Sequence, residues 1–207
     1  HVEGKVFTDE MIQWAKLPRI DSFDAVCGFW DIAFAGSKTS DFNAVRVWGV
    51  KDNNFYLLDC FVKQSKIRPA LLWINQFQEQ LPNSVYVHWR FEAQFYNDEI
   101  ERTIEEVEQT FDTKLGLIKS DKPRIKKIDR ILSLHPYYQN SRIYYSEKLK
   151  SHNDTQVGLS QLKGIEPGYK GHDDAPDSDE QAISYLSKFS KKRNNTFIIN
   201  QRDNRSY

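Results

Sequence analysis

Cysteine is scarce in this sequence, and long apolar runs are missing. Only Cys27 and Cys60 occur among the 207 residues, in two separate apolar segments. Two cysteines do not make a disulfide framework, so we expect both thiols to be reduced and buried in the core. No apolar run approaches the roughly 20 residues of a membrane-spanning helix, and residues His1–Lys5 lack a signal-peptide core. We therefore expect a cytosolic protein with no membrane segment.

A net charge is also missing, because 29 Lys and Arg residues balance 29 Asp and Glu residues. Zero net charge argues against a general nucleic-acid binder, but the average hides two opposed blocks. Residues 92–112 contain eight acids and one base, and residues 114–150 contain ten bases and three acids. We interpret the acidic block as a solvated helix face. The basic block, interleaved with tyrosines, is typical of a surface that binds a phosphate backbone.

Hydrophobic periodicity predicts an alternation of strands and helices. Strands are expected at residues 25–33, 44–50, 55–62 and 85–91, with hairpin-turn residues at 51–54 and short extended segments at 115–118 and 142–145. Helices are expected at residues 68–80, 98–111, 123–134, 156–163 and 176–189, after a lead-in with a short helix at 8–16. This order predicts an α/β ribonuclease H-like fold, in which a mixed central sheet (a three-strand antiparallel meander plus parallel strands) is flanked by helices.

The most informative stretch is an acidic cluster between a glycine-rich loop and the last helix. It runs from His172 to Glu180 and contains Asp173, Asp174 and Asp177. Crowded carboxylates raise one another's pKa unless a bound divalent cation neutralises them. The alternative is a helix N-terminus, where acids cap free N–H groups and suit the helix dipole. The cluster alone favours capping, so the rest of the chain must decide.

Acids at two distant positions favour a metal site. In the predicted fold, acids from the end of the first strand, the end of the fourth strand and the start of a late helix meet around two metal ions. This sequence has Asp31 and Glu92 at the two strand ends, and Asp173 or Asp174 at the helix. Agreement at three distant positions is harder to obtain by chance than agreement at any one of them.

Three segments of the chain resemble the C-terminal nuclease domain of the large terminase subunit of tailed bacteriophages, the motor protein that packages and cuts viral DNA. Residues 29–33 with 40–44 are similar to the first acidic motif of that family, residues 85–92 to the second and residues 171–177 to the third. The likeness covers about residues 4–187. Two positions depart from the family pattern: Ile32 replaces a frequent proline, and Ala93-Gln94-Phe95 replaces a stretch that commonly contains asparagine.

The resemblance implies an endonuclease that cuts concatemeric viral DNA during genome packaging. The implied partners are double-stranded DNA, the terminase small subunit and the portal protein, with no membrane and a monomeric isolated domain. The implied location is the host bacterial cytoplasm, transiently on the procapsid and not in the mature virion. No Gly-x4-Gly-Lys-Ser/Thr motif of an ATPase occurs, so we expect an excised domain: a lead-in or linker at 1–22, the nuclease domain at 23–190 and a polar, flexible tail at 191–207.

The chemistry of phosphodiester hydrolysis agrees with this resemblance. Two Mg²⁺ or Mn²⁺ ions activate a water, neutralise the transition state and stabilise the leaving oxygen. We predict that Asp31 bridges both ions, because the end of a central strand is a stiff position. Glu92 and Asp174 are each expected to hold one ion, with Asp173 as a neighbouring or alternative ligand.

Further residues receive secondary roles. Asp41 is a candidate outer acid or a loop brace, Asp177 a candidate for orienting a metal-bound water or a helix cap, and His172 a candidate proton donor or DNA contact. The candidates for contact with the DNA backbone are the bases before and within the predicted helix at 123–134, which could alternatively be solvated: Lys122, Arg124, Lys126 and Lys127.

Two other functions remain open from the sequence. The chain could be another nuclease of the same fold, such as a junction resolvase. It could also be a docking module with vestigial acids, which binds DNA, the portal or the small subunit without cutting. Cleavage of plasmid DNA that depends on a divalent ion separates the nucleases from the docking module.

Overall fold

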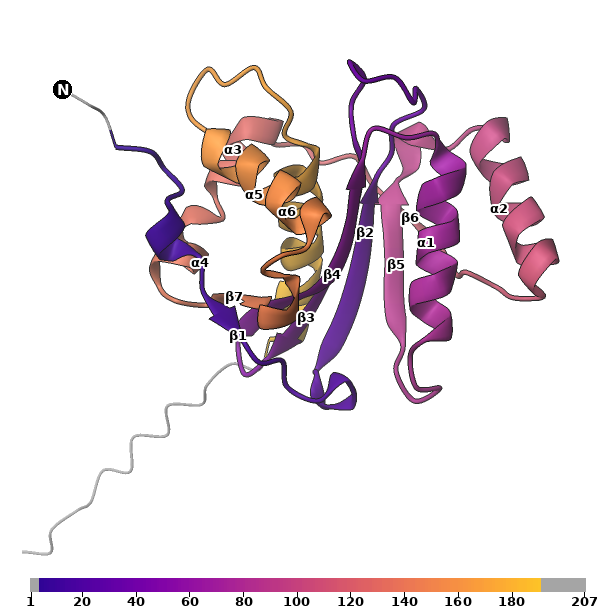
Figure 1. Cartoon of the computed structure of the whole chain (residues 1–207), viewed down its shortest axis with the longest axis horizontal. Coiled ribbons are helices and arrows are strands. Elements are labelled where there is room, and N and C mark those ends of the chain that lie inside the picture. The colour runs from indigo at the N-terminus through magenta and orange to yellow at the C-terminus, as the bar shows by residue number, and fades with distance from the viewer. Residues whose placement is uncertain (1–3, 191–207) are drawn as a thin grey trace, which may run out of the picture.

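A seven-stranded mixed sheet organises the protein (Figure 1). The computed structural model describes residues 4–190, and the strand order within them is β1-β7-β4-β3-β2-β5-β6. The centre is the predicted antiparallel meander of β2 (Ala25–Asp31), β3 (Asn43–Lys51) and β4 (Asn54–Lys63). Asp52 and Asn53 join β3 to β4 with positive φ angles of 50° and 65°. Two central turn residues in this region match the twist of a hairpin, so the predicted turn is confirmed.

Parallel strands extend the meander on both sides. On one side, β5 (Val87–Glu92) pairs with β2, and β6 (Ile118–Ser120) pairs with β5. On the other side, β7 (Ile143–Ser146) pairs with β4, and β1 (Trp14–Ala15) pairs with β7. Because β2 and β5 are parallel neighbours, Asp31 and Glu92 lie at the same edge of the sheet. The predicted ribonuclease H-like architecture is confirmed.

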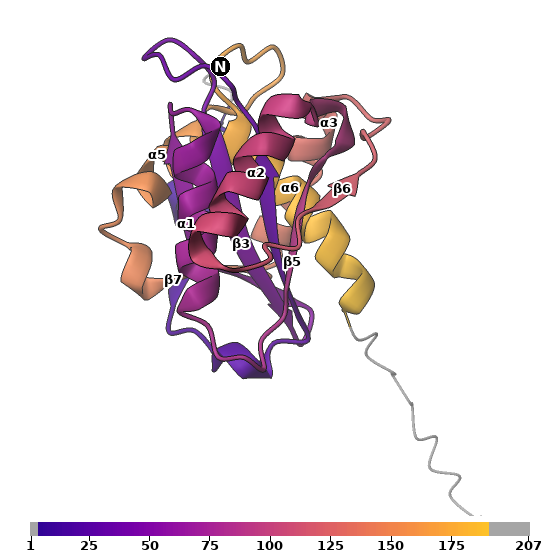
Figure 2. The ribbon, with the colours of Figure 1, turned by 90° about the vertical axis from the view of Figure 1, so that its right-hand side faces the viewer.

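Helices cover both faces of the sheet, as Figures 1 and 2 show. One face packs against α1 (Ile67–Glu79) and α2 (Asp98–Phe111), and its apolar side chains include Trp30 and Trp89. The other face packs against helices of the second half of the chain: α3 (Lys127–Leu132), α4 (His135–Gln139), α5 (Asn153–Gly164) and α6 (Asp174–Leu186). Helix α6 begins at the sheet edge where Asp31 lies and runs antiparallel to β2.

Other short segments and side chains follow the sequence-based expectations in part. Short 3₁₀ turns occupy Asp9–Met11, Ile20–Ser22, Ala93–Phe95, Glu147–Leu149 and Ser187–Phe189. Cys27 and Cys60 are free and buried, as predicted. The acidic side chains of α2 form an exposed face, also as predicted. No helix among residues 4–190 is long and apolar enough to cross a membrane.

Three predicted elements are wrong in type or extent. The helix expected at 8–16 is a 3₁₀ turn followed by β1, because the backbone of residues 13–15 pairs with β7. Phe7 is fully buried in the core, so the lead-in packs on the domain. The helix expected at 123–134 begins only at Lys127 and ends at Leu132. The separate α4 starts at His135, and its first turn contains Pro136, which has no N–H to donate. The strand expected at 115–118 lies at Ile118–Ser120. The tail predicted at 191–207 lies outside the described residues.

Candidate metal centre and active site

The parallel ends of β2 and β5 present two carboxylates at one edge of the sheet. Asp31 is partly exposed, but its Oδ2 atom is buried and has no hydrogen-bond partner among the described residues. Glu92 is buried, and its two carboxylate oxygens accept hydrogen bonds from the amides of Gln94 and Gln181, the latter at 2.9 Å. Burying a carboxylate oxygen without a hydrogen-bond partner costs folding free energy. The Oδ2 atom of Asp31 is therefore available to coordinate a cation.

The acids at the start of α6 do not act as caps of that helix. Asp173 occupies the N-cap position but makes no side-chain cap hydrogen bond. The Asp174 Oδ2 atom instead accepts a 3.0 Å hydrogen bond from the backbone N–H of Phe42, in the loop that leads into β3. The observed contacts therefore do not support the capping alternative for these two acids.

A compact group of possible metal ligands surrounds Asp174. One ligand atom from each of Asp41, His172 and Asp174 lies within 4.8 Å of the others. The His172 Nδ1 atom is 3.6 Å from Asp41 Oδ1 and 3.9 Å from Asp174 Oδ2. The His172 ring also packs edge-on against Phe42, with ring centroids 5.0 Å apart. The structure thus brings together Asp41 and His172, which sequence analysis ranked as secondary candidates, around the predicted ligand Asp174.

Asp177 lies in the same pocket as Asp31 and Glu92, which has a volume of about 290 Å³. The carboxylate of Asp177 is 2.8 Å from the Arg130 guanidinium and 3.3 Å from Lys127 Nζ. Lys127 also lies 3.3 Å from Asp173 Oδ1. Asp177 and Asp173 therefore already have cationic partners, whereas none of the described Lys or Arg side chains forms an ion pair with Asp31, Glu92 or Asp174.

Burial and mutual repulsion perturb the titration of these acids. Burial, followed by the neighbouring charges of Asp177 and Asp174, raises the pKa of Asp31 well above its ordinary value. Burial also raises the pKa of Asp174 to about 6, although its hydrogen bond with Phe42 opposes the shift. Burial lowers the pKa of Lys127, but the attraction of Asp177 and Asp31 outweighs this effect, so the net shift is upward. Carboxylates that resist ionisation together favour the binding of a cation.

Basic side chains line the pocket that holds Asp31 and Glu92. Lys122, Arg124 and Lys126 project from the segment between β6 and α3, and Lys127 is the first residue of α3. Lys122, Arg124 and Lys126 were expected on or beside a helix, but all three precede α3 in an irregular loop. Arg130 holds this loop in place, since its Nε donates a 3.3 Å hydrogen bond to the carbonyl oxygen of Ile125. The predicted DNA contacts therefore share one pocket with two of the four predicted metal ligands, Asp31 and Glu92, whereas Asp173 and Asp174 do not line it.

Sequence analysis missed three amide side chains that position the acids. Asn43 is buried at the start of β3, and its Oδ1 accepts hydrogen bonds from Trp30 Nε1 and Ala33 N, each at 2.9 Å. These bonds anchor the Trp30 side chain and the Ala33 backbone, on either side of Asp31. Gln94 and Gln181 hold Glu92. Gln181 could have been found from the sequence, because it lies seven residues after Asp174 and so shares its helix face.

Comparison with known proteins identifies the fold. No protein-family model matches the sequence, and no curated protein is significantly similar to it. The human cytomegalovirus terminase nuclease domain has a TM-score of 0.63 at 14% identity, covering 87% of this chain and 94% of that chain. A Mn-soaked form of the same domain has a TM-score of 0.61 at 13% identity, over 86% and 94%.

Two bacteriophage proteins share the same architecture. The P22 large terminase nuclease domain has a TM-score of 0.55 at 12% identity, covering 90% of this chain and 93% of that chain. The large terminase of a thermophilic bacteriophage has a TM-score of 0.58 at 13% identity, and the match covers 88% of this chain and 44% of that larger chain. The resemblance drawn from the three acidic motifs is therefore confirmed at the level of structure: this chain has the ribonuclease H-like fold of terminase nuclease domains.

Proposed function

We propose that this protein is a divalent-metal-dependent DNA endonuclease. The observation that carries the proposal is the environment of Asp31. Its carboxylate has a buried oxygen without a hydrogen-bond partner and a pKa raised by burial, Asp177 and Asp174, at the edge of the sheet where Glu92 also ends its strand. Such a group is unfavourable in the metal-free protein and becomes favourable when hard cations bind, since oxygen ligands suit Mg²⁺ and Mn²⁺.

Two ions are proposed for this site. Asp31, Glu92 and Asp174 would supply the oxygen ligands that hold them, with Asp173 as the alternative ligand. When bound, the ions would activate the attacking water, neutralise the developing charge and stabilise the leaving oxygen of the phosphodiester. Asn43 and Gln181 keep Asp31 and Glu92 in position through the hydrogen bonds described above.

His172 and Asp41 complete the site on the side of Asp174. His172 faces both Asp41 and Asp174 through Nδ1, so the two carboxylates orient its imidazole ring. We assign to His172 the transfer of a proton to the leaving oxygen, with Asp41 orienting its ring.

The substrate in this proposal is double-stranded viral DNA, which is cut during genome packaging. Lys122, Arg124 and Lys126 contact the backbone, because Lys and Arg side chains position a duplex without reading its sequence. The terminase small subunit and the portal protein are the proposed partners, and the host bacterial cytoplasm is the proposed location. The architecture shared with terminase nuclease domains supports the nuclease role in this proposal.

The decisive experiment measures nicking of supercoiled plasmid DNA in Mn²⁺ or Mg²⁺. Wild-type protein should nick the plasmid and lose activity in EDTA, and Asp31→Asn should abolish nicking while the circular dichroism spectrum stays native. Asp21→Asn, which removes an exposed charge paired with Arg19, is the matched control and should cut normally. If the wild-type protein binds DNA but shows no metal-dependent nicking, it is a docking module and not an endonuclease.

A further inference from the structure

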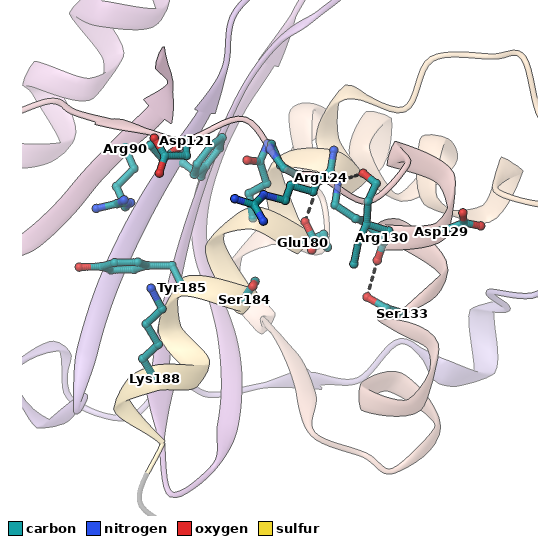
Figure 3. A pocket seen from close by; sticks show the side chains of 15 residues that line it. Arg90, Asp121, Arg124, Asp129, Arg130, Ser133, Glu180, Ser184, Tyr185 and Lys188 are labelled. Carbon is teal, nitrogen blue, oxygen red and sulfur yellow. Dashed lines mark hydrogen bonds and ion pairs between the residues drawn. The ribbon is translucent and has the colours of Figure 1, made fainter. Parts of the chain in front are cut away.

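A second hollow adjoins the pocket that contains Asp31 and Glu92, which we call the metal pocket. The second hollow lies beside β5. Its volume is about 510 Å³, and it shares Pro123, Arg124, Ile125 and Arg130 with the metal pocket. The remaining walls come from β5, from Asp121 and from the second half of α6, as Figure 3 shows. The two hollows therefore share a wall, and the second extends beside β5 toward the C-terminal end of α6 as a groove.

Strand β5 and helix α6 meet along this groove in a regular series. At the metal pocket, Glu92 accepts a hydrogen bond from Gln181. One step further, the Arg90 guanidinium stacks on the Tyr185 ring, with its carbon 4.3 Å from the ring centroid. Beyond it, the Tyr185 hydroxyl and His88 Nδ1 are 2.8 Å apart. The β5 side chains that face α6 thus change along the groove. Glu92, at the metal pocket, is a carboxylate, and Arg90, further along, is a cation that stacks on the aromatic ring of Tyr185.

Three cations of this second hollow have no carboxylate partner among the described residues. Within residues 4–190, no ion pair shorter than 4.0 Å involves Arg90, Arg124 or Lys188. Figure 3 shows Tyr185 between Arg90 and Lys188, with Arg124 directed into the hollow and Asp121 beside Arg90. The fourth cation, Arg130, pairs with the half-buried acid Glu180 at 2.8 Å. In the part of the chain that the structure describes, the lining thus offers three unpaired cations and an aromatic ring against two unpaired carboxylates, those of Asp121 and Asp129.

We propose that this hollow binds the nucleotide next to the scissile phosphate, with Arg90 and Lys188 on its phosphate and the Tyr185 ring against its sugar. Residues 92 and 90 face the same side of β5 and are separated by roughly 6.6 Å, which is similar to the step between consecutive phosphates of a DNA strand. The bases of a duplex are stacked on one another, so the ring contacts the sugar, and its cation–π contact with Arg90 holds the guanidinium in the hollow. The assignment rests on the proposed endonuclease function, since it places the scissile phosphate at Asp31 and Glu92.

The test measures binding, so that it does not depend on cleavage. The affinity of the protein for a fluorescent duplex oligonucleotide is measured in EDTA at several salt concentrations, for wild type and for Arg90→Ala/Lys188→Ala. Each lost phosphate contact reduces the slope of log K against log salt by about 0.9. The double variant should therefore show a slope shallower by about 1 to 2, and an affinity at least tenfold lower at low salt.

A matched control carries the same loss of charge on the opposite side of the sheet. Arg68→Ala/Lys114→Ala removes one Arg and one Lys that pair with Glu106 and Glu108, and it should keep the wild-type slope. Tyr185→Ala should weaken binding, whereas Tyr185→Phe, which keeps the ring and loses the hydroxyl near His88, should bind normally.

The outcomes separate this inference from the proposed function. An unchanged slope in Arg90→Ala/Lys188→Ala, with a native melting temperature, overturns the nucleotide subsite even if the protein cuts plasmid DNA. A reduced slope in a protein that never nicks DNA keeps the hollow as a DNA-contact site and overturns the endonuclease. A weakened Tyr185→Phe variant overturns the role of the Tyr185 ring, because only its hydroxyl was removed.

Discussion

The Ser178 hydroxyl donates a 2.7 Å hydrogen bond to the carbonyl oxygen of Phe29 inside the core. This bond connects α6 to β2, and its two ends lie one residue after Asp177 and two residues before Asp31. The separation between the acids of the helix and the acid of the strand therefore depends on a contact outside the site itself.

Ser178→Ala should reduce DNA nicking clearly while lowering the free energy of unfolding only slightly. Loss of one buried hydrogen bond costs about 1 kcal/mol of unfolding free energy, which leaves the domain folded at 25 °C. The lost connection between α6 and β2 should still reduce metal affinity and nicking several-fold, because metal sites tolerate little displacement of their ligands. Thr110→Ala is the control, since it removes an exposed hydroxyl bonded to the Glu106 carbonyl. Equal nicking by Ser178→Ala and wild type would show that α6 is positioned by other contacts.

Asp174 and Asp177 are expected to respond differently to replacement by Asn. Among residues 4–190, no Lys or Arg forms an ion pair with Asp174, so Asp174→Asn should abolish nicking with no loss of stability in EDTA. Asp177 neutralises Arg130 and Lys127, so Asp177→Asn should cost roughly 1–3 kcal/mol of unfolding free energy. Urea unfolding and plasmid nicking, measured on both variants, test the pair. If Asp177→Asn is stable but inactive and Asp174→Asn is active, the metal ligand is Asp177 and not Asp174.

The metal-free protein should lose stability as the pH rises. The folded-state pKa of Asp31 is raised well above its ordinary value and that of Asp174 is raised to about 6, whereas unfolded Asp titrates near pH 3.9. Their stabilising contribution is therefore complete below about pH 4 and is lost as the pH rises through the folded-state values. For Asp174 this amounts to at most about 3 kcal/mol. The lowered pKa of His88, which is caused first by burial and then by Arg90, acts in the opposite direction.

Melting temperatures in EDTA between pH 4 and pH 8 measure this effect. The wild-type curve should fall more steeply than that of Asp31→Asn, in which one of the two groups no longer titrates. Millimolar Mn²⁺ should raise the wild-type melting temperature at pH 7.5 by mass action, and the shift should shrink in the variant. Parallel pH curves for the two proteins would contradict the assignment of Asp31.

A buried ion pair behind the site should control stability without affecting metal binding. The Arg46 guanidinium contacts Asp179 at 2.6 Å, both side chains are at most 2% exposed, and Trp48 donates a further 2.7 Å hydrogen bond to Asp179. Asp179→Asn leaves a buried cation unpaired and should cost roughly 3–5 kcal/mol. Asp9→Asn, in an exposed pair with Lys163, should cost no more than about 0.5 kcal/mol. Similar unfolding free energies for the two variants would refute the role of the pair.

The basic loop should contribute to DNA binding and not to metal binding. Lys122→Ala/Arg124→Ala/Lys126→Ala should reduce nicking at low salt and flatten the salt dependence of DNA affinity, while the Mn²⁺-induced rise in melting temperature stays unchanged. Lys127 is left in place because it pairs with Asp173 and Asp177. The control removes three exposed cations elsewhere, Arg19, Lys148 and Lys150. Normal nicking with an unchanged slope would exclude the loop from the DNA interface.

Much of the fold could be predicted from local patterns. The alternation in β5 and the periodicity of α1 and α2 follow from the burial of one face of each element, and burial of an apolar face is encoded by spacing alone. The positions of Asp31 and Glu92 at the ends of their strands were predictable for the same reason, since each acid ends the apolar run of its strand. Local patterns failed where tertiary contacts overrule them: backbone pairing with β7 converts a helical pattern into β1, and the basic residues at 122–126 remain a loop braced by Arg130.

The sequence by itself determined the class of fold, the order of its elements and which acids stand at element ends, because these depend on spacing and on side-chain polarity. Only the tertiary structure decided which acids keep a free oxygen and which are neutralised by Lys127 or Arg130. It also decided that Arg90, Tyr185 and Lys188 face one groove beside the metal pocket. The physical reason is distance. Ion pairing, pKa shifts and stacking act over a few ångströms, between residues that can be more than a hundred positions apart in the chain, such as Arg46 and Asp179, which are 133 positions apart.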